Sequence, residues 1–93
     1  MHATVVDNSQ THRYEMWAED QLCFIDYRRK DNVVNLLYAK VPAALAGRGH
    51  GAALVKGALQ LIQQQHQCVI ASCSLVATYI RRHPEFQSLL IQS

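Results

Sequence analysis

The sequence lacks a long apolar run, and its cysteines are few and irregularly spaced. Its apolar stretches fall far short of the about 20 residues that a helix needs to cross a bilayer, and residues 1–20 are too polar for a signal peptide. Cys23, Cys68 and Cys73 form no Cys-x-x-Cys pair, and the histidines are scattered. We therefore expect reduced thiols, a cytoplasmic protein, no metal and no membrane partner.

An excess of charge of one sign is also missing, because 9 Lys and Arg residues face 7 Asp and Glu residues. The run 28–30 is basic, but it lies beside Asp31 and Asn32 and is typical of a solvated hairpin turn. No nucleic-acid partner is expected. The 93 residues predict one domain, 1–93, with 1–11 flexible, and a monomer or a weak dimer is equally compatible with them.

Alternation of apolar and polar residues predicts three strands, over 12–18, 22–28 and 33–41. The polar turns at 19–21 and 30–32 are short, which favours an antiparallel meander. In the second strand, Cys23, Ile25 and Tyr27 share one face. In the third, Pro42 ends the strand because proline cannot donate a ladder hydrogen bond.

A helix of 3.6-residue periodicity is predicted from about 49 to 65, followed by a wholly apolar strand at 68–71. Strand, helix and strand form a βαβ unit, so the last strand should run parallel to the third and be buried on both faces. Ser72 or Ser74 is the expected cap of a final helix over 74–82, which His83-Pro84 stops. The fold class is therefore α/β (α+β), with residues 85–93 covering one edge of the core.

The loop before the first helix carries Gly47, Gly49 and Gly51 at alternate positions. Glycines allow a sharp turn and close approach of a ligand, and the unpaired amides of a helix start favour a phosphate. A plain glycine-rich loop is an equally weighted alternative. The loop matches neither a Walker A motif nor a dinucleotide fingerprint.

Three further features bear on chemistry. The strand that ends at Val41-Pro42 could splay from its parallel neighbour and expose backbone groups, although a simple strand end is the alternative. Cys73 lies at the carboxyl end of a predicted strand and at a helix start, where a thiolate is favoured, or is simply a small buried residue. Tyr79 is either a proton donor or a core tyrosine, and His83 is expected to interact with the helix C-terminus.

Together, Val41-Pro42, the spaced glycines, a helix and a parallel strand resemble the GCN5-related N-acetyltransferase (GNAT) superfamily. Gly49 and Gly51 match the glycines of its acetyl-CoA motif, and Ala46 stands where Gln or Arg is usual. Residues 73–86 look like the minimal, single-domain family of YjdJ type. Relatives commonly have histidine where this chain has Tyr38. An imidazole can act as a general base near neutral pH, whereas a phenol keeps its proton there, so Tyr38 is a poor base for direct attack.

The resemblance implies transfer of acetyl from acetyl-CoA, or binding of coenzyme A, with an amine of a protein or peptide as the candidate acceptor. It implies that the pantetheine arm lies beside Tyr38–Val41 and reaches Cys73. The implied cofactor-binding residues are Lys40, Val41, Ala46, Gly47, Arg48, Gly49, His50, Gly51, Ala52 and Cys73. The candidate catalytic residues are Cys73, Tyr79 and Tyr38. Direct attack, a covalent route through Cys73, and a non-catalytic CoA-binding or interaction module remain open alternatives.

Overall fold

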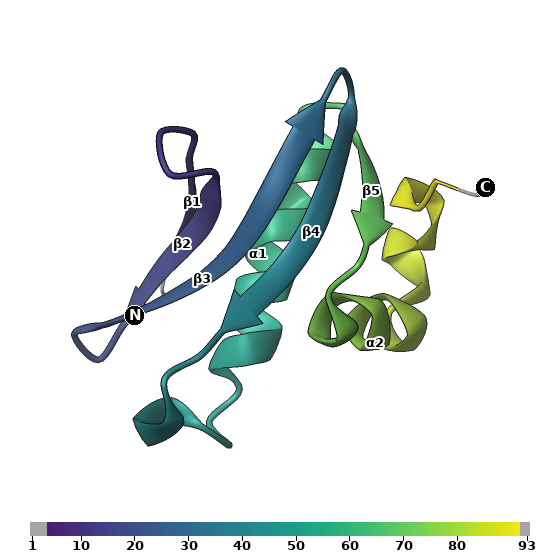
Figure 1. The fold of residues 1–93 in the computed structure, drawn as a ribbon. Helices are drawn as coiled ribbons and strands as arrows, with labels where there is room; N and C mark the ends of the chain where they lie inside the picture. The colour runs from purple at the N-terminus through teal and green to yellow at the C-terminus, as the bar shows by residue number, and fades with distance from the viewer. Residues whose placement is uncertain (1–3, 92–93) are drawn as a thin grey trace.

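A computed structural model describes residues 4–91 and shows a mixed α+β fold built on one five-stranded sheet (Figure 1). The strands lie in sequence order across the sheet: β1 (Val5–Asn8), β2 (Arg13–Ala18), β3 (Gln21–Lys30), β4 (Val33–Lys40) and β5 (Cys68–Ala71). The helices are α1 (His50–Gln64) and α2 (Ser74–Arg82), with 3-10 turns η1 (Ala43–Leu45) and η2 (Pro84–Leu89). Helix α1 crosses one face of the sheet, and α2 and η2 lie beyond β5.

The pairing of β2 through β5 is as predicted. Strands β2, β3 and β4 form an antiparallel meander, and β5 pairs with β4 in parallel, with Val33 opposite Cys68. Cys23, Ile25 and Tyr27 are buried on the face of β3 that α1 covers. Helix α1 buries Leu54, Val55, Ala58, Leu59 and Ile62, so its apolar stripe is the centre of the core.

The sequence predicts a flexible segment over 1–11, of which 1–3 lie outside the described residues, and the structure forms strand β1 within it. Val5–Asn8 pairs antiparallel with β2, with Val5 opposite Met16. Val5 is buried against α1 at Gly57, where the helix has no side chain. A four-residue strand in a polar segment is too short to show a clear alternation of apolar and polar residues. The residues that hold β1 in place belong to other elements of the chain.

Two expectations about β5 and α2 are wrong. Val69 is buried, but Ile70 is 41% exposed, because no helix within residues 4–91 covers the other face of the sheet. No serine caps α2: its N-cap residue is Cys73, and the Ser72 hydroxyl donates instead to Asn35 Oδ1 at 2.7 Å.

The C-terminal segment follows the prediction more closely. A ring nitrogen of His83 lies 2.8 Å from the Tyr79 carbonyl oxygen, which confirms the interaction at the end of α2. Phe86 and Leu89 of η2 are buried, and the Ile91 amide donates to Val69 O at 3.0 Å. Among residues 4–91, no helix combines the length and the hydropathy needed to cross a membrane.

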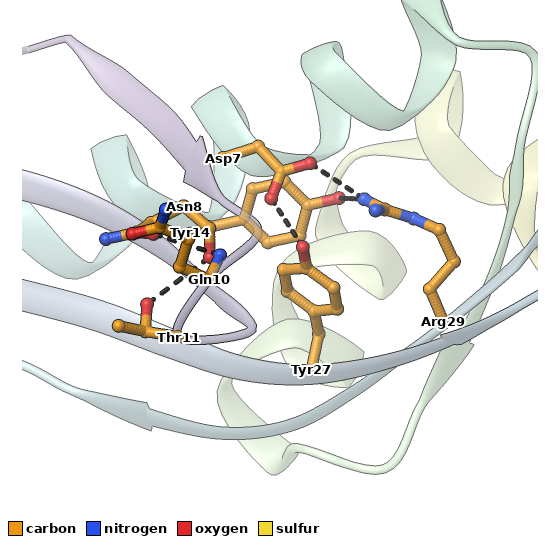
Figure 2. Close-up of polar contacts among 7 residues, drawn as sticks. All are labelled: Asp7, Asn8, Gln10, Thr11, Tyr14, Tyr27 and Arg29. Carbon is orange, nitrogen blue, oxygen red and sulfur yellow. Dashed lines mark hydrogen bonds and ion pairs between the residues drawn. The ribbon is translucent and has the colours of Figure 1, made fainter.

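A polar cluster fixes β1 to the sheet (Figure 2). The Tyr27 hydroxyl donates to Asp7 Oδ1 at 2.5 Å, and Arg29 donates to Asp7 Oδ2 at 2.8 Å and to the Tyr14 hydroxyl at 3.2 Å. Arg29 therefore does not belong to the solvated turn that the sequence suggested. Its charge is paired and its side chain is partly buried.

This cluster makes stability sensitive to high pH. Burial and the neighbouring Asp7 carboxylate raise the pKa of Tyr27 to about 12 from 10.0. Between these values the unfolded chain releases a proton that the folded chain keeps, so the contribution of Tyr27 to the free energy of unfolding should be constant below pH 10 and fall from there toward pH 12. In Tyr27→Phe this part of the fall should vanish. Urea unfolding of both proteins from pH 8 to 12 measures it, and equal slopes would contradict the assignment.

Candidate cofactor and active site

The sheet contains a β-bulge in β4 at Leu37. Tyr27 lies opposite Leu36 and Asp26 lies opposite Tyr38, so Leu37 is the extra residue. Strand β5 stops pairing at the same place: its last partner is Leu36, and the Cys73 amide then donates to Leu36 O at 2.8 Å. Within the described chain, residues 37–40 of β4 have no partner in β5, because β5 ends at Ala71 and the chain turns into α2. The two strands part at the bulge in this sense only, and the edge of β4 is open from Leu37 onward.

The bulge also decides which side chains of β4 face the core. Strict alternation from Leu36 would turn Tyr38 inward, but the extra residue reverses the order beyond it. Ala39 and Val41 therefore pack against the core, and Tyr38 is 53% exposed on the open face near Phe24, with ring centroids 6.3 Å apart. Nothing in the sequence marks a bulge here, because every residue from 36 to 39 suits a strand.

The glycine loop makes the turn that its sequence predicted. Gly47 and Gly49 have φ values of 79° and 81°, a region that residues with a side chain rarely adopt. Gly49 is the N-cap of α1, with no side-chain cap and no acidic residue in the first turn. Ala53 donates the first helical bond, to Gly49 O at 3.1 Å, so the amides of residues 50–52 have no partner within the helix.

The resemblance implies that the backbone amides of residues 46–52 bind the pyrophosphate, and one of these seven amides already has a partner. The Ala46 amide donates to Ala43 O at 3.1 Å and closes the η1 turn. The available amides therefore begin at Gly47, one residue later than the resemblance implied.

Gly51 is the point at which the site elements meet. A Cβ atom built on Gly51 would lie 3.7 Å from Val41 Cγ2 and 3.6 Å from Leu75 Cδ2. The start of α1, the end of β4 and the first turn of α2 are thus in contact around a residue that has no side chain. The fold brings Val41, the glycine turn and the Cys73 segment together, as the predicted site requires.

The side chains of Arg48 and His50 bind Glu19 in the β2–β3 turn. Arg48 donates to the two Glu19 oxygens at 2.6 and 2.7 Å, and His50 Nε2 lies 3.3 Å from Glu19 Oε2. The hydrogen bonds from Arg48 and then His50 lower the pKa of Glu19. Glu19 was missed by sequence reasoning, since only the folded sheet brings residue 19 beside residues 48–50.

Cys73 lies at the mouth of the parted strands. It is 7% exposed, is not in a disulfide, and its carbonyl oxygen accepts from the Ala77 amide at 3.0 Å in the first turn of α2. Its amide donates to Leu36 O, so Cys73 lies beside the last residue of β4 that pairs with β5. Its burial restricts access to a ligand that enters between β4 and β5.

Tyr79 lies farther along α2, in a stack of rings. Its ring is parallel to that of His83, with centroids 3.8 Å apart, and lies 6.1 Å from the ring of Phe86. Burial, with a smaller effect of the Glu85 charge, raises the pKa of Tyr79. The raised pKa keeps the phenol protonated near neutral pH but also makes it a weaker acid. Six residues separate Tyr79 from Cys73, or about 9 Å along the helix axis, and helical side chains lean toward the N-terminus.

Comparison with known proteins identifies the family. Residues 13–89, well over half of the chain, match the family model described as GCN5-related N-acetyl-transferase. The chain belongs to this family. The family generally uses acetyl-CoA as its acetyl donor. The finer resemblance to the YjdJ type stays a prediction.

The fold is also similar to a solved structure. It matches the NMR solution structure of a "GCN5-like putative N-acetyltransferase" from Staphylococcus aureus with a TM-score of 0.70 and 22% sequence identity. The match covers 96% of this chain and 88% of that chain. It confirms the predicted GNAT-like fold.

Proposed function

We propose that this protein transfers an acetyl group from acetyl-CoA to an amine, holding the cofactor across the glycine turn and the parted edges of β4 and β5. The observation that carries the proposal is the edge of β4 that β5 leaves open from Leu37 onward, which leads to Val41 beside a helix start with unpaired amides. Family membership supports the same assignment. The three unpaired cysteines fit a cytoplasmic location.

In this assignment the two parts of the cofactor use different backbone groups. The pyrophosphate binds the amides of residues 47–52, where the helix dipole and the open amides favour an anion. The amide-containing pantetheine arm pairs with the β4 backbone from Leu37 to Val41, past the point where β5 has left it, and Lys40 lies exposed at the end of this edge. The thioester then lies between the bulge and Cys73.

The chemistry requires a nucleophile, a polarised carbonyl and a proton for the leaving thiolate. A neutral amine attacks the thioester carbon, and the C–N bond forms with an oxyanion that a backbone amide beyond the bulge stabilises. The C–S bond breaks as the oxyanion collapses, and the new amide nitrogen loses one proton to the solvent. Tyr79 of α2 is one candidate donor of the proton that the CoA thiolate takes up, and its phenolate then regains a proton from the solvent. Tyr38, on the open face, is the second candidate. In a covalent route the Cys73 thiolate attacks first and the amine then attacks the acetyl-cysteine.

Acetyl transfer to a panel of amines tests the function, and Cys73→Ala separates the two routes. If the acetyl group passes through the thiol, this variant should lose about a thousandfold in kcat/KM, and mass spectrometry of wild type with acetyl-CoA alone should find acetyl on Cys73. If attack is direct, the loss should stay below about tenfold. Cys68→Ala, a partly buried thiol at the other end of β5, is the matched control.

A non-catalytic CoA-binding module is the second candidate function. It is favoured by Tyr38, a phenol on the open face where relatives commonly have histidine. Under this alternative CoA raises the melting temperature of the protein but no amine in the panel is acetylated. Failure of millimolar CoA to shift the melting temperature would instead remove the cofactor assignment itself.

The Glu19 carboxylate should weaken cofactor binding. It holds Arg48 and His50 and places a negative charge beside the proposed pyrophosphate site. Glu19→Gln should therefore raise the affinity for CoA about two- to fivefold at low ionic strength, because Arg48 is released. Isothermal titration at two salt concentrations measures it, and the gain should shrink at high salt. Unchanged or weaker binding in Glu19→Gln at low salt would show that Arg48 does not meet the cofactor.

A further inference from the structure

An open hollow in the surface of the protein reaches the bulge at Leu37. The β1–β2 turn stands apart from the far end of β3 (Figure 1), and between them lies an open hollow of about 870 Å³. Its lining includes Thr11 and His12 from the turn, Asp26 and Arg28 from β3, and Leu37 from β4. We call this feature the acceptor hollow.

The acceptor hollow ends at the bulge. Leu37, the extra residue of β4, forms part of its lining, and Asp26 is the β3 partner of Tyr38. Asp26 and Arg28 alternate with the buried Ile25 and Tyr27, so they project from the face that α1 leaves uncovered. A molecule that contacts Asp26 and Leu37 in the hollow would therefore reach the bulge from the side opposite the helices.

The hollow has a negatively charged side chain near the bulge and a positively charged side chain farther from it. Oδ1 of Asp26 accepts from Arg13 Nε at 2.7 Å, and among the described residues nothing engages Oδ2. Arg28 lies two residues along the same face, which places it about 7 Å farther from the bulge, and it has no ion-pair partner in the described chain. Arg29, also in the lining, is neutralised by Asp7. The Asp26 carboxylate thus lies near the bulge, paired with Arg13 through Oδ1 and open to a ligand at Oδ2, and one unpaired guanidinium lies farther out.

We propose that the acceptor hollow binds the acetyl acceptor, a primary amine that also carries a carboxylate, as an amino acid or a short peptide does. Asp26 holds the ammonium group beside the bulge, and Arg28 pairs with the carboxylate. The ammonium releases one proton to the solvent in the open hollow before its nitrogen attacks. This inference rests on the proposed acetyl transfer and names the class of substrate for that site.

The test compares lysine with 1,5-diaminopentane, which has the same terminal amine without a carboxylate. Asp26→Asn should raise the KM for both amines at least tenfold, whereas Arg28→Gln should raise it for lysine and leave the diamine unchanged. Arg13→Gln breaks the Arg13–Asp26 pair but keeps the carboxylate, so it should not raise the KM. Asp20→Asn and Arg81→Gln remove the same charges from exposed positions outside the hollow and should behave as wild type.

The outcomes separate this inference from the proposed function. If wild type acetylates amines and Asp26→Asn and Arg28→Gln match the two control variants, the acceptor binds elsewhere and the transferase assignment stands. If wild type acetylates nothing, NMR titration of the CoA-bound protein with lysine decides whether the hollow binds the amine. Shifts confined to the amides of Asp26, Arg28 and Leu37 would keep the hollow as a binding site and remove the transferase. Absence of such shifts would overturn the inference.

Discussion

Replacing Gly57 with alanine should destabilise the protein by about 2–3 kcal/mol, although the residue lies inside α1. A Cβ atom at this position would overlap Val5 Cγ2 and lie 2.8 Å from Val5 Cβ. Val5 is β-branched and has little rotamer freedom, so strand β1 must move away from the helix. Helix propensity alone predicts the opposite sign, a gain of about 1 kcal/mol for Gly to Ala.

A double-mutant cycle with Val5→Ala identifies the cause. Urea unfolding of the two single variants and of the double variant should show that Gly57→Ala costs less stability when Val5 is alanine, because Cγ2 is gone. Part of the loss should remain, since alanine keeps the Cβ atom at 2.8 Å. Gly51→Ala is the matched control in the same helix, because its Cβ would make only ordinary contacts at 3.6–3.7 Å. Equal stability changes in Gly51→Ala and Gly57→Ala would contradict the packing argument.

Segments with strong local periodicity were predictable from the sequence alone. The predicted strand at 68–71 and helix at 74–82 have the bounds of β5 and α2, and the helix expected at about 49–65 is α1, at His50–Gln64. Glycine at positions 47 and 49 correctly marked a turn with positive φ. In each case the residues that form the element also carry its signal.

Features made by distant residues were not predictable in this way. Strand β1 depends on the space at Gly57 and on the Asp7 partners Tyr27 and Arg29, which lie on other elements. The bulge at Leu37 arises from the register between β3 and β4, and it moves Tyr38 from the inner to the open face. Local pattern cannot report a register that is decided by packing on both sides of a strand.

The same limit applies to the site. Sequence reasoning found the glycine turn and the position of Cys73, because each is a local motif. It missed Glu19, whose contact with Arg48 spans 29 positions of the chain. It also missed the acceptor hollow, whose lining comes from the β1–β2 turn, β3 and β4. A site assembled from several strands becomes visible only when their order and register are known.

Gly49→Val should reduce the affinity for CoA by at least about 30-fold, the largest binding effect that we expect from one residue. Gly49 has a φ of 81° at the N-cap of α1, and a β-branched residue strongly disfavours this conformation. The space around the position is open, and a Cβ atom placed on Gly49 would have no neighbouring atom within 4 Å, so the effect arises from backbone strain and not from a clash. A strained turn points the amides of residues 50–52 away from a common centre.

Gly49→Asn is the control that isolates the backbone. Asparagine adopts positive φ far more readily than valine does, and the open space accommodates its side chain. We therefore expect Gly49→Asn to bind CoA within about fivefold of wild type, measured by isothermal titration and by the shift in melting temperature that saturating CoA produces. Equal losses in both variants would mean that the side chain itself obstructs the ligand. If neither variant loses affinity, the pyrophosphate does not bind at this turn, and the amides at the start of α1 have no part in holding the cofactor.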